Sequence, residues 1–274
     1  MARIGMVNYI NTAPIYEVWK EQVNRPDWQV IEAPPSSLNR MLAADELDLG
    51  FVSSYEYAAR PWKYRILADL SISATGPVGS VFLFSTLPLE ELENKLVLMT
   101  GQSDTSVCLV RIILEEFLGV RPRYTSGEVF GAPVPGNEPA AVLAIGDEAL
   151  RLKVENRYPV RVDLAEVWNK KTGLPFVFAV CAVREEFLGR QADTAREIHQ
   201  TFLDCRRLGL EQLPEICDRV ARRIPMDCEA CSLYLRAMEY DLGPAKQAAL
   251  ERFFTLLIDR GEADKAALPL KIFQ

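Results

Sequence analysis

The chain has 274 residues, of which 49% are apolar and 25% are charged, a composition typical of a folded globular protein with a sizeable core. Its formal net charge is -7 and its Lys and Arg residues are scattered, which excludes a nucleic-acid-binding footprint. No apolar run approaches the roughly 18 residues that span a bilayer, and the first residues, MARIGMVNYI, lack a secretory signal pattern, so we expect a cytoplasmic protein without a membrane segment.

The first predicted elements are a strand over 3–8 and a helix that begins near Thr12, joined through the segment VNYINTAPIY. Thr12 is the expected N-cap, and Pro14 fits the first turn because its missing N–H has no helical partner there. Asn8 and Asn11 therefore stand at a strand-to-helix corner. Asparagines in this position serve either as turn and capping residues or as one wall of a ligand cleft, and the sequence leaves both interpretations open.

The segment PPSSLNRMLAADELDLG repeats this pattern. Ser36 or Ser37 is expected to cap a helix with one apolar face, and Gly50 is expected to follow the end of that helix. The next predicted segments are the strand LGFVSS, a helical turn from Tyr55, and extended stretches over 66–73 and 80–85.

A second unit begins near residue 88. Its predicted elements are, in chain order, a short helix PLEELEN, a strand KLVLMT, a helix over 105–118 that ends at Gly119, an extended RPRYTS, a loop over 127–139, a strand AAVLAIG, a helix DEALRLK and a strand over 174–183. Alternating strands and helices predict a parallel or mixed sheet with helices on both faces. After Arg184 the chain is predicted to be helical, over 191–209, 211–223, 227–240 and 244–260.

The extended stretches over 80–86 and 176–183 bracket this middle unit. Such bracketing is typical of a two-lobed α/β protein whose chain crosses to the second lobe and returns on paired strands. We expect one lobe from residues 1–86 and 180–274 and the other from residues 87–179. A ligand cleft between them would lie at the carboxyl ends of strands and the N-termini of helices.

Small polar side chains and glycines gather at these strand ends and helix starts. They are Asn8, Asn11, Ser53, Ser54, Gly79, Ser80, Ser103, Thr105, Ser106, Gly146 and Asp147. Almost no cationic residue accompanies them, which predicts a neutral cleft that donates hydrogen bonds. Hydroxyls and unpaired N–H groups at a helix start can hold a carboxylate, and SDTS at 103–106 is the best candidate. Asp104 or Thr105 could equally be a simple helix cap, and Asp147 could act as a general base only if it faces the cleft.

Several common active-site patterns are missing from the sequence. The six cysteines are too few and too irregular for a disulfide scaffold, and the close pair Cys228 and Cys231 is interpreted as packing. His199, the single histidine, falls within a predicted helix and is interpreted as a packing or surface residue. No nucleophile elbow, phosphate loop, dinucleotide fingerprint or zinc spacing occurs, so we expect no metal site and no cofactor.

Six segments between residues 4 and 184 together resemble one family. They are IGMVNYINTAPIY, LDLGFVSSYEYA, SATGPVGSVFLFS, SDTSVCLVRIIL, AVLAIGDEAL and TGLPFVFAV. In this order they resemble the chorismate dehydratases of the futalosine route to menaquinone, cytoplasmic enzymes with the two-lobed periplasmic-binding-protein type II fold.

The resemblance implies a hydro-lyase that removes water from chorismate to give 3-[(1-carboxyvinyl)oxy]benzoate, without a metal or redox cofactor. It implies that Asn11 lies next to the reacting ring, that Ser80 is another cleft contact, and that Thr105 with Ser106 anchors a carboxylate. Because no His or Lys is well placed as a base, we hypothesise that the enolpyruvyl carboxylate of the substrate takes the proton. Asn11 and Ser80 would then hold the reactive conformer.

Two alternatives share this fold. The enzyme 1,4-dihydroxy-6-naphthoate synthase belongs to the same pathway but relies on a histidine in the second lobe, which this sequence lacks. A non-catalytic binding protein for a small carboxylate would need an export signal. The amphipathic helices of the C-terminal third could form a homodimer interface, and the sequence does not decide the oligomeric state.

Overall fold

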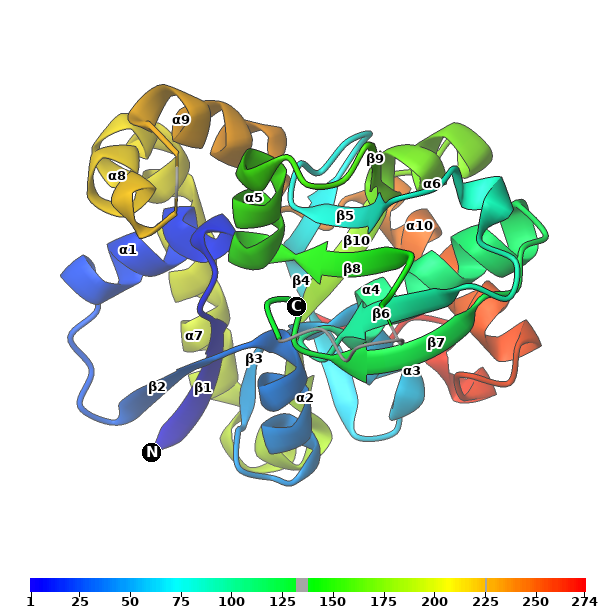
Figure 1. Cartoon of the computed structure of the whole chain (residues 1–274). Helices are drawn as coiled ribbons and strands as arrows, with labels where there is room; N and C mark the ends of the chain where they lie inside the picture. The colour runs from blue at the N-terminus through cyan, green and yellow to red at the C-terminus, as the bar shows by residue number, and fades with distance from the viewer. Residues whose placement is uncertain (132–137, 225) are drawn as a thin grey trace.

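The computed structural model describes residues 1–131, 138–224 and 226–274 and shows two mixed β-sheets flanked by helices (Figure 1). The first sheet has six strands, in the order β11 (Ile272–Phe273), β4 (Tyr64–Ala74), β10 (Phe176–Arg184), β3 (Leu49–Ser53), β1 (Ala2–Val7) and β2 (Trp28–Ala33). The second has five, in the order β7 (Arg123–Gly127), β6 (Leu96–Thr100), β8 (Ala141–Ile145), β5 (Val81–Ser85) and β9 (Val160–Asp163). We call each sheet with its helices a lobe. The expected two-lobed α/β architecture is confirmed.

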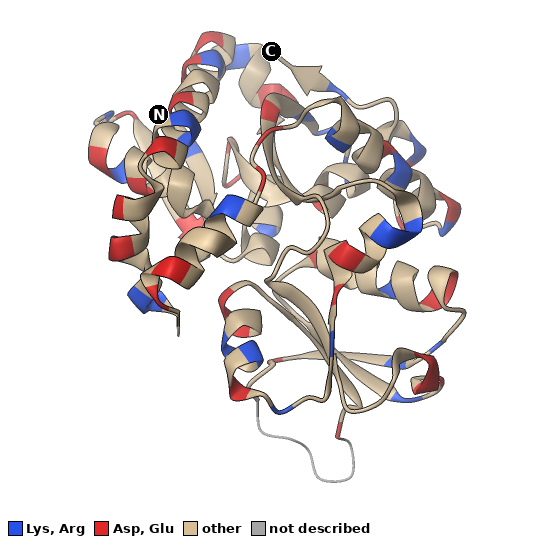
Figure 2. Cartoon of the chain, turned by 90° about the horizontal axis from the view of Figure 1, so that it is seen from above, with Lys and Arg blue, Asp and Glu red and all other residues tan. Residues whose placement is uncertain are grey.

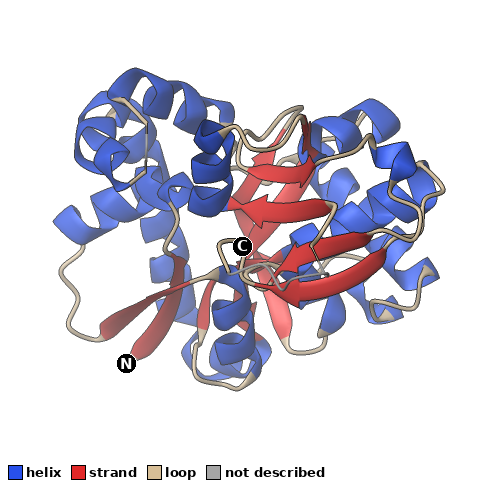
Figure 3. Ribbon diagram, in the orientation of Figure 1, coloured by secondary structure: helices blue, strands red, loops and turns tan. Residues whose placement is uncertain are grey.

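The helices cover both sheets (Figure 3). The α-helices are α1 (Ala13–Gln22), α2 (Pro35–Ala43), α3 (Ser54–Ala59), α4 (Asp104–Arg111), α5 (Gly146–Glu155), α6 (Leu164–Thr172), α7 (Glu185–Glu211), α8 (Leu213–Val220), α9 (Cys228–Ala237) and α10 (Pro244–Asp259). The 3-10 turns are η1 (Ile10–Thr12), η2 (Leu89–Glu91), η4 (Ala221–Arg223) and η5 (Lys265–Ala267), and α4 continues as a π-helical stretch, η3 (Ile112–Phe117). The expected loop over 127–139 falls partly outside the described residues.

Two short connections join the lobes. Residues 75–80 lead from β4 to β5, and residues 173–175 lead from α6 back to β10. β5 pairs with β8 and β9, whereas β10 pairs with β3 and β4, so the stretches expected to pair with each other lie in different sheets. Residues 81–85 belong to the five-stranded sheet and residues 176–179 to the six-stranded one, unlike the division expected from the sequence. Both strands are apolar runs buried on two faces, a pattern that does not identify the partner strand.

The starts of two helices differ from the expected capping. Thr12 precedes α1, but its hydroxyl donates to the carbonyls of Val7 and Tyr9 and does not accept from the helix. Ser36 and Ser37 lie inside α2, which begins at Pro35 because proline fits the first helical turn.

Gly50 does not follow the end of α2, because α2 ends near Ala44 and the chain turns through Asp45, which has a positive φ of 63°. Gly50 lies within β3, where a Cβ atom would come within 2.2 Å of the backbone of Gly5 on β1. Its hydrogen side chain therefore permits the close approach of these two strands.

The sequence analysis missed β9 and α6, which lie between α5 and β10. The strand has only four residues, VRVD, and offers a weak alternating pattern. The helix carries a clear start signal, because Asp163 accepts from the N–H groups of Ala165 and Glu166 and a glutamate stands three residues after the cap.

Aromatic packing joins the two lobes next to the 173–175 connection. Trp168 on α6 is fully buried, and its ring centroid lies 5.2 Å from that of Phe176 on β10 and 6.1 Å from that of Phe253 on α10. Large aromatic side chains bury the most apolar area and favour such edge-to-face contacts. This cluster therefore holds the two lobes together at one end.

Charged residues lie mainly on the outer helices and loops, while the strands of both sheets carry few of them (Figure 2). No helix in the described ranges combines the length and the apolar character that crossing a bilayer requires. His199 is buried on α7, where its Nε2 lies 2.6 Å from the carbonyl oxygen of Ala68, which confirms a packing role.

Candidate active site

A cavity lies between the two sheets, and both lobes contribute to its wall. Its volume is about 50 Å³, which is room for a few water molecules. It is lined by Val7, Tyr9, Asn11, Pro35, Ser53, Ile72, Val78, Ser80, Val81, Ser103, Ser106, Ile145, Gly146, Phe178, Ala179 and Met238. Six of the residues predicted from strand ends and helix starts are among them, namely Asn11, Ser53, Ser80, Ser103, Ser106 and Gly146.

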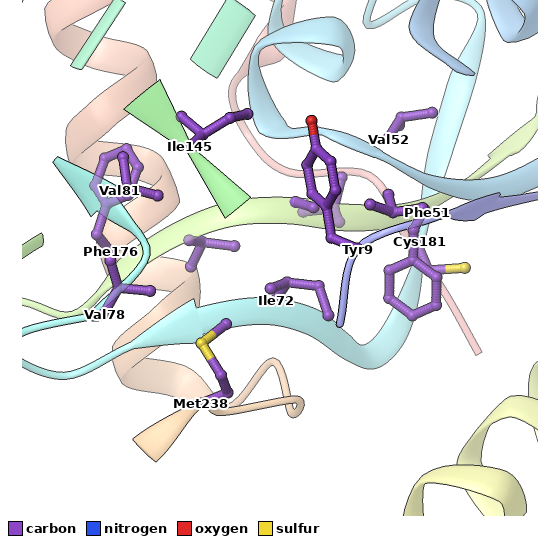
Figure 4. Close-up of a cluster of buried hydrophobic side chains, with 14 of the residues drawn as sticks. Tyr9, Phe51, Val52, Ile72, Val78, Val81, Ile145, Phe176, Cys181 and Met238 are labelled. Atoms are coloured by element: carbon purple, nitrogen blue, oxygen red, sulfur yellow. The ribbon is translucent and has the colours of Figure 1, made fainter. Parts of the chain in front are cut away.

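One part of the wall is apolar. Figure 4 shows Ile72, Val78, Val81 and Met238 around this space, with Ile145 and Tyr9 on its other side. These side chains come from β4, the 75–80 connection, β5, β8 and the end of α9, so distant parts of the sequence meet here. An apolar wall of this kind suits the ring of a small ligand.

The polar side chains of the wall are all uncharged. They are the phenol of Tyr9, the amide of Asn11 and the hydroxyls of Ser53, Ser80, Ser103 and Ser106. Among the described residues, none donates to the buried Oδ1 atom of Asn11. A buried amide oxygen without a partner is unfavourable, and it belongs to a residue of the cavity wall.

The start of α4 lies at the cavity, since Ser103 and Ser106 belong to its wall. Ser103 is the N-cap, and its hydroxyl accepts from the N–H of Ser106 and donates to the Ser106 hydroxyl, both at 3.2 Å. The hydroxyl proton of Ser106 is thereby left available to a ligand. The helix macrodipole adds a partial positive charge here, which favours an anion.

Thr105 does not fit the role expected for it. It is fully buried and absent from the cavity wall, and its hydroxyl accepts from the backbone N–H of Tyr55 at 2.9 Å. This bond connects α4 of the second lobe to α3 of the first. The carboxylate anchor expected from Thr105 and Ser106 together is therefore reduced to Ser106.

Four other expected site residues also lie outside the wall. Ser54 donates to the carbonyl of Val177 at 2.7 Å, and Gly79 donates its N–H to Asp163 at 2.7 Å, so both fix the backbone beside the cavity. The Oδ1 atom of Asn8 is buried without a partner among the described residues, as in Asn11, but does not reach the cavity. We find no structural explanation for this unpaired atom.

Asp147 is the fourth of these residues, and it does not face the cavity as a general base would have to. One of its oxygens accepts from the backbone N–H of Ile10 at 3.4 Å, again across the two lobes. Burial raises the pKa of this carboxyl, while Arg223 and Arg151 partly offset the rise.

Tyr9 is the most prominent wall residue that the sequence analysis overlooked. Its hydroxyl donates to the side chain of Gln102, and its ring packs on Gly146, where a Cβ atom would come within 2.9 Å of the ring. Gly146 also has a positive φ of 54°. Burial raises the pKa of Tyr9 well above its usual range, so its phenol stays protonated and donates. Tyr9 lies in the VNYINT segment, between the two asparagines assigned to the cleft, and this position could have identified it as a wall residue.

Hydrogen bonds between the lobes close the cleft around the cavity. Besides the contacts of Tyr9, Thr105 and Asp147, the side chain of Asn39 on α2 donates to Asp104 at 2.8 Å. The backbone N–H of Ser36 donates to the carbonyl of Gln102 at 3.0 Å. The cavity is much smaller than the roughly 300–1,000 Å³ of typical ligand pockets, and these bonds join the lobes beside it.

Two lobes joined by two connections, with a cavity between them, define the architecture of the periplasmic binding proteins, and a comparison of folds agrees. The structure of the periplasmic aliphatic sulphonate binding protein SsuA from Escherichia coli superposes with a TM-score of 0.69 at 12% identity, over 100% of this chain and 92% of that one. This likeness shows the shared fold.

The sequence then identifies the family. Residues 2–259 match the family described as menaquinone biosynthesis. A chorismate dehydratase from Thermus thermophilus is 31% identical over 265 residues, which cover 91% of this chain and 93% of the relative. Another chorismate dehydratase, from Campylobacter jejuni, is 29% identical over 181 residues, 64% of each chain. The chain belongs to the menaquinone biosynthesis family, as the resemblance indicated.

Proposed function

We propose that this protein is a chorismate dehydratase, a hydro-lyase that converts chorismate into 3-[(1-carboxyvinyl)oxy]benzoate for menaquinone biosynthesis. Its membership of the family and its similarity to two chorismate dehydratases support this activity. The structural observation that carries the proposal is the cavity between the lobes, whose wall combines the side chain of Asn11 and several hydroxyl-bearing residues with apolar side chains.

Chorismate combines an unsaturated ring with two carboxylates, and the cavity offers a counterpart to each. Ile72, Val78 and Met238 can cover the ring. The start of α4, with the Ser106 hydroxyl and the free backbone N–H groups, can hold one carboxylate without a cationic side chain. Desolvated donors of this kind bind an anion strongly because little water competes with them.

The reaction must remove a proton from the ring carbon that bears the enolpyruvyl ether and break the bond to the neighbouring hydroxyl. The product ring is aromatic, which supplies a large driving force. Neither a histidine, a lysine nor a carboxylate appears among the described wall residues. We therefore infer that the enolpyruvyl carboxylate of the substrate acts as the base and accepts the ring proton. Asn11 and Ser80 would hold the substrate in the conformer in which this transfer can occur.

Substrate entry would require the lobes to separate and then close again. The connections at 75–80 and 173–175 are the places where the chain can bend, and the hydrogen bonds around Tyr9, Asn39 and Thr105 would reform over the bound substrate. Closure would exclude water, which strengthens every polar contact inside.

The decisive experiment is incubation of the purified protein with chorismate. Loss of the diene absorbance and identification of 3-[(1-carboxyvinyl)oxy]benzoate by mass spectrometry and NMR would support the dehydratase. Tight chorismate binding, measured by calorimetry, without any turnover would instead support a non-catalytic binding protein. The proposed biosynthetic role fits a cytoplasmic location, and a homodimer is a proposal for analytical ultracentrifugation to test.

A further inference from the structure

A tyrosine from the C-terminal helices contacts a residue of the cavity wall without lining the cavity itself. The hydroxyl of Tyr234 on α9 lies 2.9 Å from the hydroxyl oxygen of Ser80, and both residues are buried. Ser80 lines the cavity, whereas Tyr234 does not. The hydrogen bond to Ser80 is therefore a route by which Tyr234 can influence a bound molecule.

The direction of this hydrogen bond follows from the state of the phenol. Complete burial raises the pKa of Tyr234 well above its usual range, so the phenol keeps its proton. Within the described part of the chain, Ser80 Oγ lies at hydrogen-bond distance from that hydroxyl and can accept its proton. A buried O–H group needs an acceptor, so Tyr234 donates and Ser80 accepts. Since a serine hydroxyl carries one proton, the Ser80 proton stays free to point into the cavity.

The backbone around Ser80 is fixed from several sides. The N–H groups of Val78 and Gly79 donate to Asp163 at 3.2 and 2.7 Å, and the carbonyl of Ser80 accepts from the N–H of Gly146 at 2.8 Å. Asp163 also caps α6, so the connection between the lobes is tied to that helix. With its backbone held in this way, the Ser80 hydroxyl can change direction only by rotation, and the contact with Tyr234 restricts that rotation.

We propose that Tyr234 is a positioning residue that directs the hydroxyl proton of Ser80 toward the departing oxygen of the substrate. This inference rests on the proposed dehydratase activity. As the carbon–oxygen bond breaks, its electron pair leaves with that oxygen, and Ser80 donates a hydrogen bond to the growing negative charge. The departing hydroxide finally combines with the proton taken from the ring carbon, so that water is the product.

The test compares Tyr234→Phe, Ser80→Ala and the double variant in chorismate turnover. Tyr234→Phe should lower kcat by about tenfold to hundredfold with little change in KM, because the ring stays and only the direction of a transition-state donor is lost. The double variant should be no slower than Ser80→Ala, since Tyr234 acts through Ser80. If the fold-losses in kcat of the two single variants multiply in the double variant, the residues act independently and the proposal is overturned.

Tyr240→Phe is the matched control. Tyr240 is another buried tyrosine on the same segment, and among the described residues its hydroxyl has no hydrogen-bond partner. Its replacement removes a buried hydroxyl without touching Ser80, so kcat should remain within about twofold of the wild type. A loss equal to that of Tyr234→Phe would mean that the effect is structural. Thermal unfolding of each variant checks that it folds.

Binding measurements separate this inference from the proposed activity. Because the hydrogen bond from Ser80 strengthens only as the carbon–oxygen bond breaks, Tyr234→Phe should leave the Kd for chorismate, measured before turnover in a stopped-flow instrument, within about twofold of the wild type. A wild-type protein without turnover would refute the proposed function. A wild type that turns chorismate over, together with a Tyr234→Phe variant whose kcat is unchanged or whose loss lies in the Kd for chorismate, would refute the role of Tyr234 alone.

Discussion

The side-chain amide of Asn39 bonds to the carboxylate of Asp104 at 2.8 Å and so connects α2 of the first lobe to α4 of the second. The same amide also donates to the Ser53 hydroxyl at 2.8 Å, and its oxygen accepts from the Ser53 N–H at 3.0 Å. Asn39 is almost fully buried. A single side chain thus fixes the end of β3, where Ser53 enters the cavity wall, and one contact between the lobes.

Replacing Asn39 by Ala should lower the free energy of unfolding by about 2–3 kcal/mol, because the Ser53 N–H is left buried without an acceptor. Asp104→Ala removes only the bond between the lobes and should lower it by about 1 kcal/mol. Urea unfolding followed by tryptophan fluorescence measures both values. Equal losses would show that the bonds to Ser53 do not contribute.

Asn11→Ala should lower kcat for chorismate by about 100-fold or more, since correct positioning of reacting groups contributes more than one ordinary hydrogen bond. Asn8→Ala is the control, because Asn8 belongs to the same segment but lies outside the cavity wall. Its kcat should stay within a few fold of the wild type. Near-normal turnover by Asn11→Ala, measured from the diene absorbance, would defeat the assigned role of Asn11.

Gly146→Ala should reduce both stability and turnover. The new methyl group would meet the ring of Tyr9 at 2.9 Å and would also strain a residue with a φ of 54°. Gly261→Ala is the control, because Gly261 has a φ of 70° but no atom within 4 Å of the added Cβ. The control should lose about 1 kcal/mol of stability from strain alone and keep its kcat. If Gly146→Ala and Gly261→Ala lose the same stability and keep the same kcat, the contact between Gly146 and Tyr9 has no effect on the site.

Asp147→Asn should stabilise the protein at neutral pH. Burial raises the pKa of Asp147 above its ordinary value of 3.8, so the folded state binds the proton more tightly than the unfolded state. The stability of the wild type therefore falls as the pH rises from 3.8 through the raised pKa, and it stays lower above that window. The amide oxygen of Asn can still accept from Ile10, so the variant avoids this loss.

Urea unfolding of wild type and Asp147→Asn across this pH range measures the difference, which should disappear below the ordinary carboxyl pKa. A difference that is independent of pH would contradict the assigned cause. The variant should also retain turnover, because Asp147 lies outside the cavity wall.

The sequence predicted those residues of the cavity wall that depend on local structure. Asn11, Ser103 and Gly146 stand where a strand gives way to a helix, and strand ends of an α/β fold converge on one edge. The fold was predictable because strands and helices alternate along the sequence, and because six segments in order resemble one family of known fold. Thr105 was misassigned because neighbouring hydroxyls at a helix start point in different directions, which only the packing of α3 against α4 decides.

The remaining wall depends on contacts distant in sequence. Met238 lines the cavity and Tyr234 contacts the wall residue Ser80. Both lie more than 150 positions after Ser80, and no local pattern links them to the cavity. The pairing of β10 between β3 and β4 is equally non-local. Hydrophobic periodicity predicts that such a strand exists but does not give its neighbours.

The position of β10 also bears on how the chain is made. This strand is an inner member of the six-stranded sheet, but the ribosome synthesises it only after the whole segment that forms the five-stranded sheet. The nested segment from β5 to α6 is continuous and can acquire its structure early during translation. The surrounding lobe must keep the edges of β3 and β4 unpaired until residues 176–184 emerge, an interval in which those exposed edges are open to mispairing.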